Sequence, residues 1–560
     1  MEKECDDPRA RARTRTTHSP TPIPTFHLSL SFFLSLSLSL PPNSSYFPVP
    51  ILQNGTKLTC EPPRGLRANV SRSLDLMIDI EGLGDFEGCA KPLPWKKLVI
   101  GLCFLHGIIL ERMKFGPLGF NIKYPFNDTD METCIVMLRL FLDERPDIPW
   151  DAIEYLNGMI NYGGRVTDDW DRRCLQAIIR IFILPEALEV GYVYSASGVY
   201  YPPEPCSIDE LRGYVAALPI NDSPEIFGMH QNANIAYNLQ EANALLATAL
   251  VIMPRTSGGG GGIVKTPDEI VSEMAIAFQE RIPAIFTMDE AHESAFTKRG
   301  EHQDSLSTVL GQEMVRFNKL LEVVGRTLVD VQRAIQGEIL LDATLDALYT
   351  CFMKNMVPPV WEDAAYPSLK PLAQWFDNLV ERCAFIRLWL TTGPPTCFWM
   401  GGLVFPQGFM TGVLQNFSRK WSIAIDVLNF AYDVLPLSDP AELKKAQIPD
   451  DGVLVNGLFI ACGSWDYEHK LLVDPLPGKM FSDLPIIHFL PSDSYKSSGY
   501  LGKPREGLYA CPVYKTTVRQ GMLSTTGMST NYVVPVDLPT KQTTDFWVLR
   551  GCALICAVND

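Results

Sequence analysis

The chain has 560 residues, of which 46% are hydrophobic and 20% charged, a balance that excludes a wholly disordered protein and leaves room for roughly three or four domains. Its 64 acidic and 48 basic side chains give a net charge of −16, which argues against a protein that binds nucleic acid over its whole surface. The 14 cysteines include no CxxC pair, and only Cys552 and Cys556 lie close together. This spacing indicates neither a zinc site nor a disulfide framework. We therefore expect the protein to work in a reducing, cytosolic compartment.

The first 72 residues differ in composition from the rest. Four arginines between residues 9 and 15 precede FHLSLSFFLSLSLSLPP (26–42), which has the charged and apolar regions of a secretory signal. Serine interrupts the apolar run, which is shorter than the roughly 20 residues of a membrane span. The repeated Leu-Ser of this segment is also what a CT dinucleotide repeat encodes when it is translated in frame. We therefore favour a disordered or spurious low-complexity leader over residues 1–72, with a working signal as the alternative.

Packed sequence begins near Leu74, and the first helix signal is WKKLVIGLCFLHGIILERMKFG (95–116). Apolar residues recur there at helical spacing, which predicts a buried helix. Glu111, Arg112 and Lys114 mark its polar end.

A second helix is predicted within residues 162–182. Thr167 is the expected N-cap, and Asp168 and Asp169 fall in the first turn, where acids satisfy free N–H groups and the helix dipole. The nearby Asp171 makes a cluster of three aspartates that could instead hold a metal ion. No second carboxylate cluster accompanies them, so we favour the helix cap.

Two amphipathic helices follow, at 312–335 and 371–390, the second stopped by Thr-Thr-Gly-Pro-Pro. The first has one apolar stripe, while its charged residues, Glu313 among them, lie mostly elsewhere. The stripe consists of Met314, Phe317, Leu321, Val324, Leu328, Val331 and Ile335.

After about residue 450 the hydrophobic period shortens. Four segments rich in β-branched and aromatic residues are separated by turn residues, which predicts successive antiparallel strands in a small barrel or sandwich. These segments are GVLVNGLFIACG, LYACPVYKTTV, STNYVVPVDLP and DFWVLRGCALICAV. Helices first and strands last indicate an α+β fold with segregated parts.

The glycine-rich segment GGGGGIVKT (258–266) has some features of a phosphate-binding loop. A Walker A loop needs G-x-x-x-x-G-K-[ST], and Val264 stands where the second glycine is required. A β-branched residue resists the positive φ of such turns. The preceding ANALLATALVIMPR also reads as a helix and not as a buried strand. We therefore expect a linker here.

Other enzyme-like patterns are incomplete. The acidic box Asp289-Glu290-Ala291-His292 is spelled like that of a helicase, yet one short helix alone separates it from the glycines. The zincin pattern HExxH beginning at His292 has Phe296 in place of its second histidine. We predict no catalytic, cofactor-binding or metal site.

His230, near Asn232 and Asn234, has no matched acid or nucleophile nearby. We therefore expect it to be a structural histidine or a cap. A proton-transfer site is the less favoured alternative.

A collinear series of motifs resembles the C-terminal region of an axonemal dynein heavy chain, of the inner-arm type. The series runs from roughly Leu83 to the end over about 475 residues, and its order makes it highly specific. It includes FEGCAKPLPWKKLVIGLCFLHGIILERMKFGPLGFNIKYPFN, INYGGRVTDDWDRRCL, SGVYYPP, PEIFGMHQNANIAYN, YPSLKPLAQW, FWMGGLVFPQGFMTGVLQNFSRK, PDDGVLVNGLF, CPVYKTTVRQG and LSTTGMSTNYVV.

The resemblance implies three folded parts after the leader. Residues 73–188 correspond to the helical lid of the sixth AAA+ module. Residues 189–448 correspond to the helical half of the dynein C-terminal domain, and residues 449–560 to its antiparallel β-barrel. In this family the glycine-rich loop lies inside the C-terminal domain, and ATP and Mg²⁺ bind in earlier modules.

The implied role is a structural and regulatory element of an ATP-driven, minus-end-directed microtubule motor for ciliary and flagellar movement. Its expected location is the cytoplasm and cytoskeleton, in the axoneme. The expected partners are the rest of the motor ring, dynein intermediate and light chains through the parent molecule, and the microtubule through a stalk upstream of this region. We expect no cofactor, nucleic acid or membrane here. Although the parent family is an ATPase, this chain alone is predicted to be non-catalytic.

Because the similarity begins midway through a module, we expect a fragment or truncated gene model, with a genuine short product as the alternative. Two other function classes remain open. One is a free-standing ATPase that uses the degenerate loop 258–266. The other is a secreted or membrane-anchored interaction protein, which glycosylation at Asn54 or Asn127 would reveal.

Overall fold

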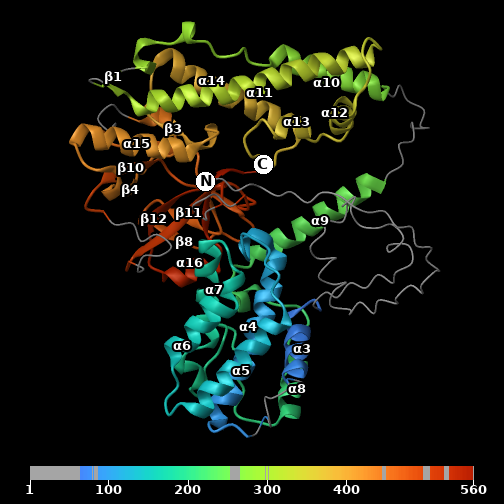
Figure 1. The fold of residues 1–560 in the computed structure, drawn as a ribbon, viewed down its shortest axis with the longest axis vertical. Coiled ribbons are helices and arrows are strands. Elements are labelled where there is room, and N and C mark those ends of the chain that lie inside the picture. Colours follow the sequence, from blue (N-terminus) through green and yellow to red (C-terminus); the bar gives the residue numbers. More distant parts are fainter. Residues whose placement is uncertain are drawn as a thin grey trace, which may run out of the picture. The chain divides into compact units, whose positions relative to one another are not determined.

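The computed structural model describes residues 63–78, 80, 86, 88–252, 265–296, 298–299, 302–443, 449–495, 505–522 and 529–558. Residues 63–560 form one compact unit (Figure 1). Most of the predicted leader lies outside the described residues. Its last part is helical, because the first described helix begins at Leu66.

The N-terminal part is built from helices. They are α3 (Leu66–Ile78), α4 (Pro92–Arg112), α5 (Asp128–Glu144), α6 (Trp150–Tyr155), α7 (Asp169–Phe182) and α8 (Ile208–Ala217). Helix α4 confirms the buried helix expected at 95–116, and it contacts α3, α5 and α7. An 18-residue window within Pro92–Leu118 is long and apolar enough to span a membrane, but 78% of it is buried inside the protein. Burial of a helix that is apolar all round is expected at the centre of a bundle.

A second helical group follows along the chain. It consists of α9 (Asn232–Ile252), α10 (Pro267–Arg281), α11 (Ser305–Ile335), α12 (Ala343–Met353), α13 (Pro359–Glu362), α14 (Leu372–Thr392) and α15 (Pro406–Trp421). Helix α11 contacts α10, α12, α14 and α15 and is the centre of this group (Figure 1).

The predicted stripe of α11 faces the core. Its six residues from Met314 to Val331 are buried, and Ile335 is partly buried. Glu313 lies outside this stripe, and its side chain is nevertheless only 1% exposed. Its carboxylate accepts hydrogen bonds from the backbone N–H groups of Val404 and Phe405 at 2.7 and 2.9 Å. A carboxylate can be buried when such donors replace water.

The strands form two main sheets, one small hairpin of β1 (Lys298–Arg299) and β2 (His302–Gln303), and a pair of β7 (Ser464–Asp466) and β8 (Leu471–Val473). One sheet has the order β3-β5-β10-β4 and the other the order β12-β11-β13-β6-β9. Their bounds are β3 (Phe398–Trp399), β4 (Asn429–Val434), β5 (Val453–Asn456), β6 (Phe459–Ala461), β9 (Phe481–Asp483), β10 (Ile487–Ser492), β11 (Leu508–Thr516), β12 (Tyr532–Pro539) and β13 (Ala553–Ala557).

The helix-then-strand order of the α+β prediction is confirmed, with three differences. The pairs β11–β13 and β3–β5 are parallel, and β3 and β4 precede the expected start of the strands at residue 449. The segment DFWVLR is not a strand but helix α16 (Thr544–Leu549). Thr543 caps this helix, because its side-chain oxygen accepts from the Phe546 N–H. Trp547 is fully buried and donates to Thr540 Oγ1 at 2.8 Å.

Candidate functional site

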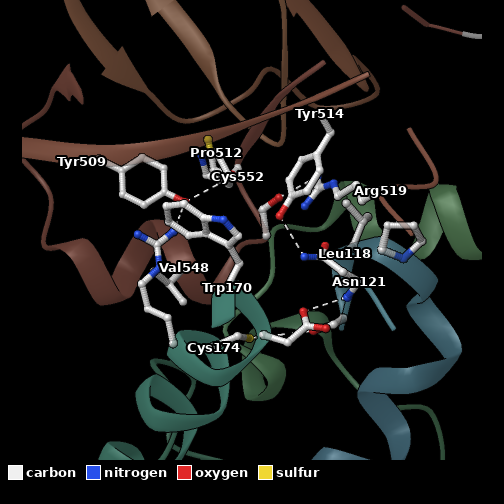
Figure 2. Close-up of a pocket in the computed structure, with 15 residues that line it drawn as sticks. Leu118, Asn121, Trp170, Cys174, Tyr509, Pro512, Tyr514, Arg519, Val548 and Cys552 are labelled. Carbon is white, nitrogen blue, oxygen red and sulfur yellow. Dashed lines mark hydrogen bonds between the residues drawn. The ribbon is translucent and has the colours of Figure 1, made fainter. Parts of the chain in front are cut away.

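A buried polar junction connects the N-terminal helices to the C-terminal strands. We define the junction as Asn121, Asp168, Asp171 and Arg173 on the helical side, with Tyr509 and Tyr514 on strand β11. A cavity of about 30 Å³ lies between the two sides (Figure 2). This volume suits roughly one or two water molecules and is too small for a nucleotide.

Asp168 holds the start of helix α7. Its side chain accepts hydrogen bonds from the backbone N–H groups of Trp170 and Asp171 at 2.9 and 3.1 Å. The prediction of Thr167 as the N-cap was therefore wrong by one residue. Thr167 is exposed, whereas Asp168 is 1% exposed and satisfies N–H groups that water does not reach.

Asp171 fixes the segment before α5 onto α7. One carboxylate oxygen accepts from the Asn121 N–H at 2.8 Å, and the other accepts from the Ile122 N–H at 3.1 Å and from Tyr124 Oη at 2.8 Å. Burial, together with the neighbouring charge of Asp168, raises the pKa of Asp171 to about 7. Both carboxylates accept hydrogen bonds from N–H and O–H donors and hold the local backbone in place.

Two side chains cross from the helical side to strand β11. Asn121 Nδ2 donates to Tyr514 Oη at 2.8 Å, a bond between residues 393 positions apart. Arg173 donates to the Ala510 carbonyl at 3.0 Å and to Tyr509 Oη at 3.2 Å. Tyr509 Oη in turn donates to the Cys552 carbonyl at 2.8 Å (Figure 2). The helical side is thereby bonded to β11, and β11 is bonded in turn to the segment before β13.

Arg112, at the end of α4, makes a further connection beside the junction. Arg112 ends α4, as the polar end expected at residues 111, 112 and 114 indicates, and its side chain is fully buried, while that of Glu111 is buried too. The guanidinium donates to the carbonyls of Phe227 and Leu549, the latter at 3.1 Å. Longer bonds of 3.4 and 3.3 Å reach the carbonyls of Leu118 and Gly119. A single guanidinium thus connects three separate segments.

Asn232 makes a third connection, at the start of α9. Its side-chain amide donates to the carbonyls of Leu476 and Lys479, both at 3.0 Å, and its side-chain oxygen accepts from the Gly478 N–H at 2.9 Å. His230 Nδ1 accepts from the Asn232 N–H at 3.2 Å. Burial, followed by the charge of Arg550, lowers the pKa of His230. These contacts give His230 a capping role in the structure.

Of the two ATPase-like motifs, the structure describes Lys265 and Thr266 at the end of the first and the whole of the acidic box. Residues 253–264, with the glycines, lie outside the described residues. Lys265 pairs with Glu273 at 2.6 Å, and Thr266 caps α10. Asp289 follows the other end of α10, whose 15 residues span about 22 Å.

The acidic box itself connects to helix α14. The Glu290 carboxylate accepts from Arg387, and the His292 N–H donates to the Leu390 carbonyl at 2.9 Å. Within the described ranges no group of three or more His, Cys, Asp or Glu side chains is placed to hold a metal ion. The candidate functional site is therefore the junction, which fixes one group of elements against another.

Comparison with known proteins identifies both sides of the junction. The family model for the AAA lid domain of dynein heavy chains matches residues 95–233, and the one for their C-terminal domain matches residues 239–556. The protein is 44% identical to human dynein axonemal heavy chain 6 and 42% identical to mouse dynein axonemal heavy chain 1. Human dynein axonemal heavy chain 3 is 40% identical.

Each of these similarities covers 92% of this chain and 12% of the relative. The matched share of 92% is larger than the share of the chain that residues 83–560 make up. The similarity therefore extends upstream of Leu83. The chain spans about one eighth of the length of the relatives it matches. By these matches, the chain belongs to the dynein heavy chain family and carries its AAA lid and C-terminal domains.

Proposed function

We propose that this chain is a structural and regulatory element of an axonemal dynein, an ATP-driven, minus-end-directed microtubule motor of cilia and flagella. In this proposal the polypeptide contributes no nucleotide site. ATP and Mg²⁺ are bound by other modules of the motor, and the chain works in the axoneme as part of the dynein complex. The observation that carries the proposal is the junction, where Asn121 and Arg173 bond the AAA lid helices to strand β11.

The geometry of the junction supports a mechanical role. Five of its six residues are buried and Arg173 is half-buried, so sliding one side past the other would break several hydrogen bonds that water could replace only in part. A movement of the lid is then passed to the C-terminal domain as rigid-body motion. Coupling of this kind acts through the relative stability of motor states and not through chemistry.

The exposed surface of helix α9 is evidence for a binding partner in the remainder of the motor ring. Every described side chain from Asn238 to Ala249 is exposed, including Leu239 at 54%, Leu245 at 72% and Leu246 at 62%. The helix carries a single charged residue, Glu241. A helix this apolar is normally covered by protein. Intermediate and light chains, and the microtubule, would be reached through the parent molecule.

We also propose that the two main sheets are parts of one barrel. Tyr432 Oη on β4 donates to the Pro535 carbonyl on β12, and β4 and β12 are in contact. These two strands are edge strands of different sheets, which is the arrangement that closure requires.

A motility assay tests the coupling role. The full-length heavy chain would carry Tyr514→Phe and Arg173→Met together, which remove the side-chain bonds across the junction and leave the apolar cores intact. We expect basal ATP hydrolysis to persist while the microtubule-stimulated rate and gliding velocity drop several-fold. Arg180→Met, which removes an exposed ion pair with Asp545, is the matched control. Gliding at the control velocity would refute the proposal.

Nucleotide binding separates the proposal from the free-standing ATPase. The purified chain should show no saturable binding of Mg-ATP in equilibrium dialysis, because Lys265 and Asp289 lie at opposite ends of α10. Binding that is lost on Lys265→Ala would favour the ATPase instead. Asn127 is exposed and caps α5 in a reciprocal box with Asp130; glycosylation there in cells would favour the secreted alternative.

A further inference from the structure

The two aspartates of the junction, Asp168 and Asp171, are buried close together without a counter-ion. They lie three residues apart at the start of α7 and are 1% and 3% exposed. Their hydrogen-bond partners are backbone N–H groups, the Asn121 amide and the Tyr124 hydroxyl, all of which are neutral. Arg173 donates to strand β11 instead. Within the described ranges, no lysine or arginine forms an ion pair with either carboxylate.

Burial and a neighbouring like charge both favour the protonated form of a carboxyl group. Two carboxylates that share a dry site can therefore hold one proton between them. Burial, followed by the charge of Asp168, raises the pKa of Asp171 to about 7. Burial raises the pKa of Asp168 as well. The pair is therefore expected to gain or lose one proton near neutral pH.

The other charged and titratable groups around the pair keep their charge near neutral pH. Burial raises the pKa values of the tyrosine and cysteine side chains that face the pair, so these stay protonated. Arginine stays charged, and Asp169 adds a negative charge beside Asp168. The remaining groups are Arg173 and Cys174 of α7, Tyr124 before α5, Arg112 of α4, and Tyr509, Tyr514, Arg519 and Cys552 on the side of the strands.

The pair holds a side chain that crosses the junction. Asp171 accepts from the Asn121 backbone N–H at 2.8 Å. The Asn121 amide lies 3.4 Å from Asp168 Oδ1 and donates to Tyr514 Oη at 2.8 Å (Figure 2). A change in the charge of the pair therefore acts directly on a bond between the two sides. The cavity of about 30 Å³, which Asp171 lines, has room for a water molecule that can take up a released proton.

We propose that Asp168 and Asp171 form a proton-operated regulator of the junction. With one proton shared between them, the pair keeps Asn121 in place and the junction closed. When this proton leaves to water at alkaline pH, two negative charges face each other in a buried site, and the junction opens more often. The inference rests on the coupling role, because the junction can regulate the motor only if it passes movement from the lid to the C-terminal domain.

The sign and size of the effect follow from the two states of Asp171. Opening the junction exposes this carboxyl group to water, where the pKa of an aspartate is about 4. The closed junction, with a pKa of about 7, is therefore favoured by the proton below about pH 4, and this advantage is lost as the pH rises through about 7. Between pH 6 and pH 8 the open fraction should rise about tenfold.

Hydrogen exchange on the full chain, followed by mass spectrometry between pH 6 and pH 8, tests the regulator. The readout is a peptide that contains the N–H groups of Asn121 and Ile122, both of which donate to Asp171. After division by the chemical exchange rate at each pH, exchange of these two amides should rise about tenfold over this range. Exchange that follows the chemical rate alone would overturn the proposal.

Matched variants assign the pH dependence to the pair. Asp171→Asn should abolish it, whereas Asp169→Asn, on the same helix, should retain it. Asp168→Asn keeps an N-cap side chain but removes the like charge, so the rise in exchange should move to lower pH. This variant keeps the test valid should Asp171→Asn fail to fold, which thermal melts verify. A wild-type profile in both Asp168→Asn and Asp171→Asn would overturn the proposal.

Gliding assays separate this inference from the coupling role. In the full-length heavy chain, the ratio of the gliding velocities of Asp171→Asn and Asp169→Asn should change between pH 6 and pH 8. A constant ratio, together with exchange that titrates as expected, would overturn regulation of the motor by this proton. Exchange that does not depend on the pair would overturn the inference without affecting the coupling role, which Tyr514→Phe with Arg173→Met tests separately.

Discussion

Replacing Arg112 by Met removes the guanidinium that donates hydrogen bonds to three separate segments. A flexible apolar side chain remains in its place. Two carbonyls, of Phe227 and Leu549, lose their best donor. Each such loss costs about 1–2 kcal/mol, and the two long bonds to residues 118 and 119 add less than about 1 kcal/mol. Removal of a buried cation recovers part of its desolvation cost. The expected net loss in the free energy of unfolding is about 3 kcal/mol.

Urea denaturation followed by tryptophan fluorescence measures this loss, with Arg180→Met as control. Arg180 also connects to the C-terminal domain, through Asp545, but its side chain is 47% exposed, so its ion pairs contribute at most about 1 kcal/mol. Because a protein of this size can unfold in steps, hydrogen exchange in helix α16 gives a local readout next to Leu549. A destabilisation no larger for Arg112→Met than for Arg180→Met would refute the reasoning.

Two further predictions concern buried groups. The pKa of Asp171 is raised to about 7, so the folded protein keeps a proton that the unfolded chain releases. The free energy of unfolding should therefore fall between about pH 4 and pH 7, by about 1.4 kcal/mol per pKa unit. Urea denaturation across this range should show a flatter profile for Asp171→Asn than for Asp169→Asn; identical profiles would contradict the assignment. Leu328→Asp should unfold the α11 bundle, whereas Val329→Asp, at a side chain 46% exposed, should melt normally by circular dichroism. A soluble, cooperatively melting Leu328→Asp protein would count against the packing of α11.

Helices with a continuous apolar period were predictable from sequence, and their buried polar residues were not. The stripe of α11 follows from spacing alone. Carboxylates are seldom buried, and the donors that allow burial of Glu313, the N–H groups of Val404 and Phe405, lie about 90 residues further along the chain. Periodicity within one helix contains no information about such distant donors. Segment DFWVLR was assigned to a strand by its aromatic content, and the Thr543 cap with the burial of Trp547 outweighed that preference.

The candidate site was hidden for the same reason, and its backbone geometry explains how the two sides approach so closely. Gly551 adopts a φ of +67°, and a Cβ there would lie 2.7 Å from the Leu118 carbonyl. Gly228 adopts a φ of +70°, and its Cβ would lie 2.7 Å from the Leu549 side chain. Both glycines therefore permit contacts that any other residue would push apart. Arg112 bonds the carbonyls of these same neighbours, Leu118 and Leu549. Close backbone approach and a shared buried donor together make separation of the two sides costly, so the lid and the C-terminal domain are expected to move as one body.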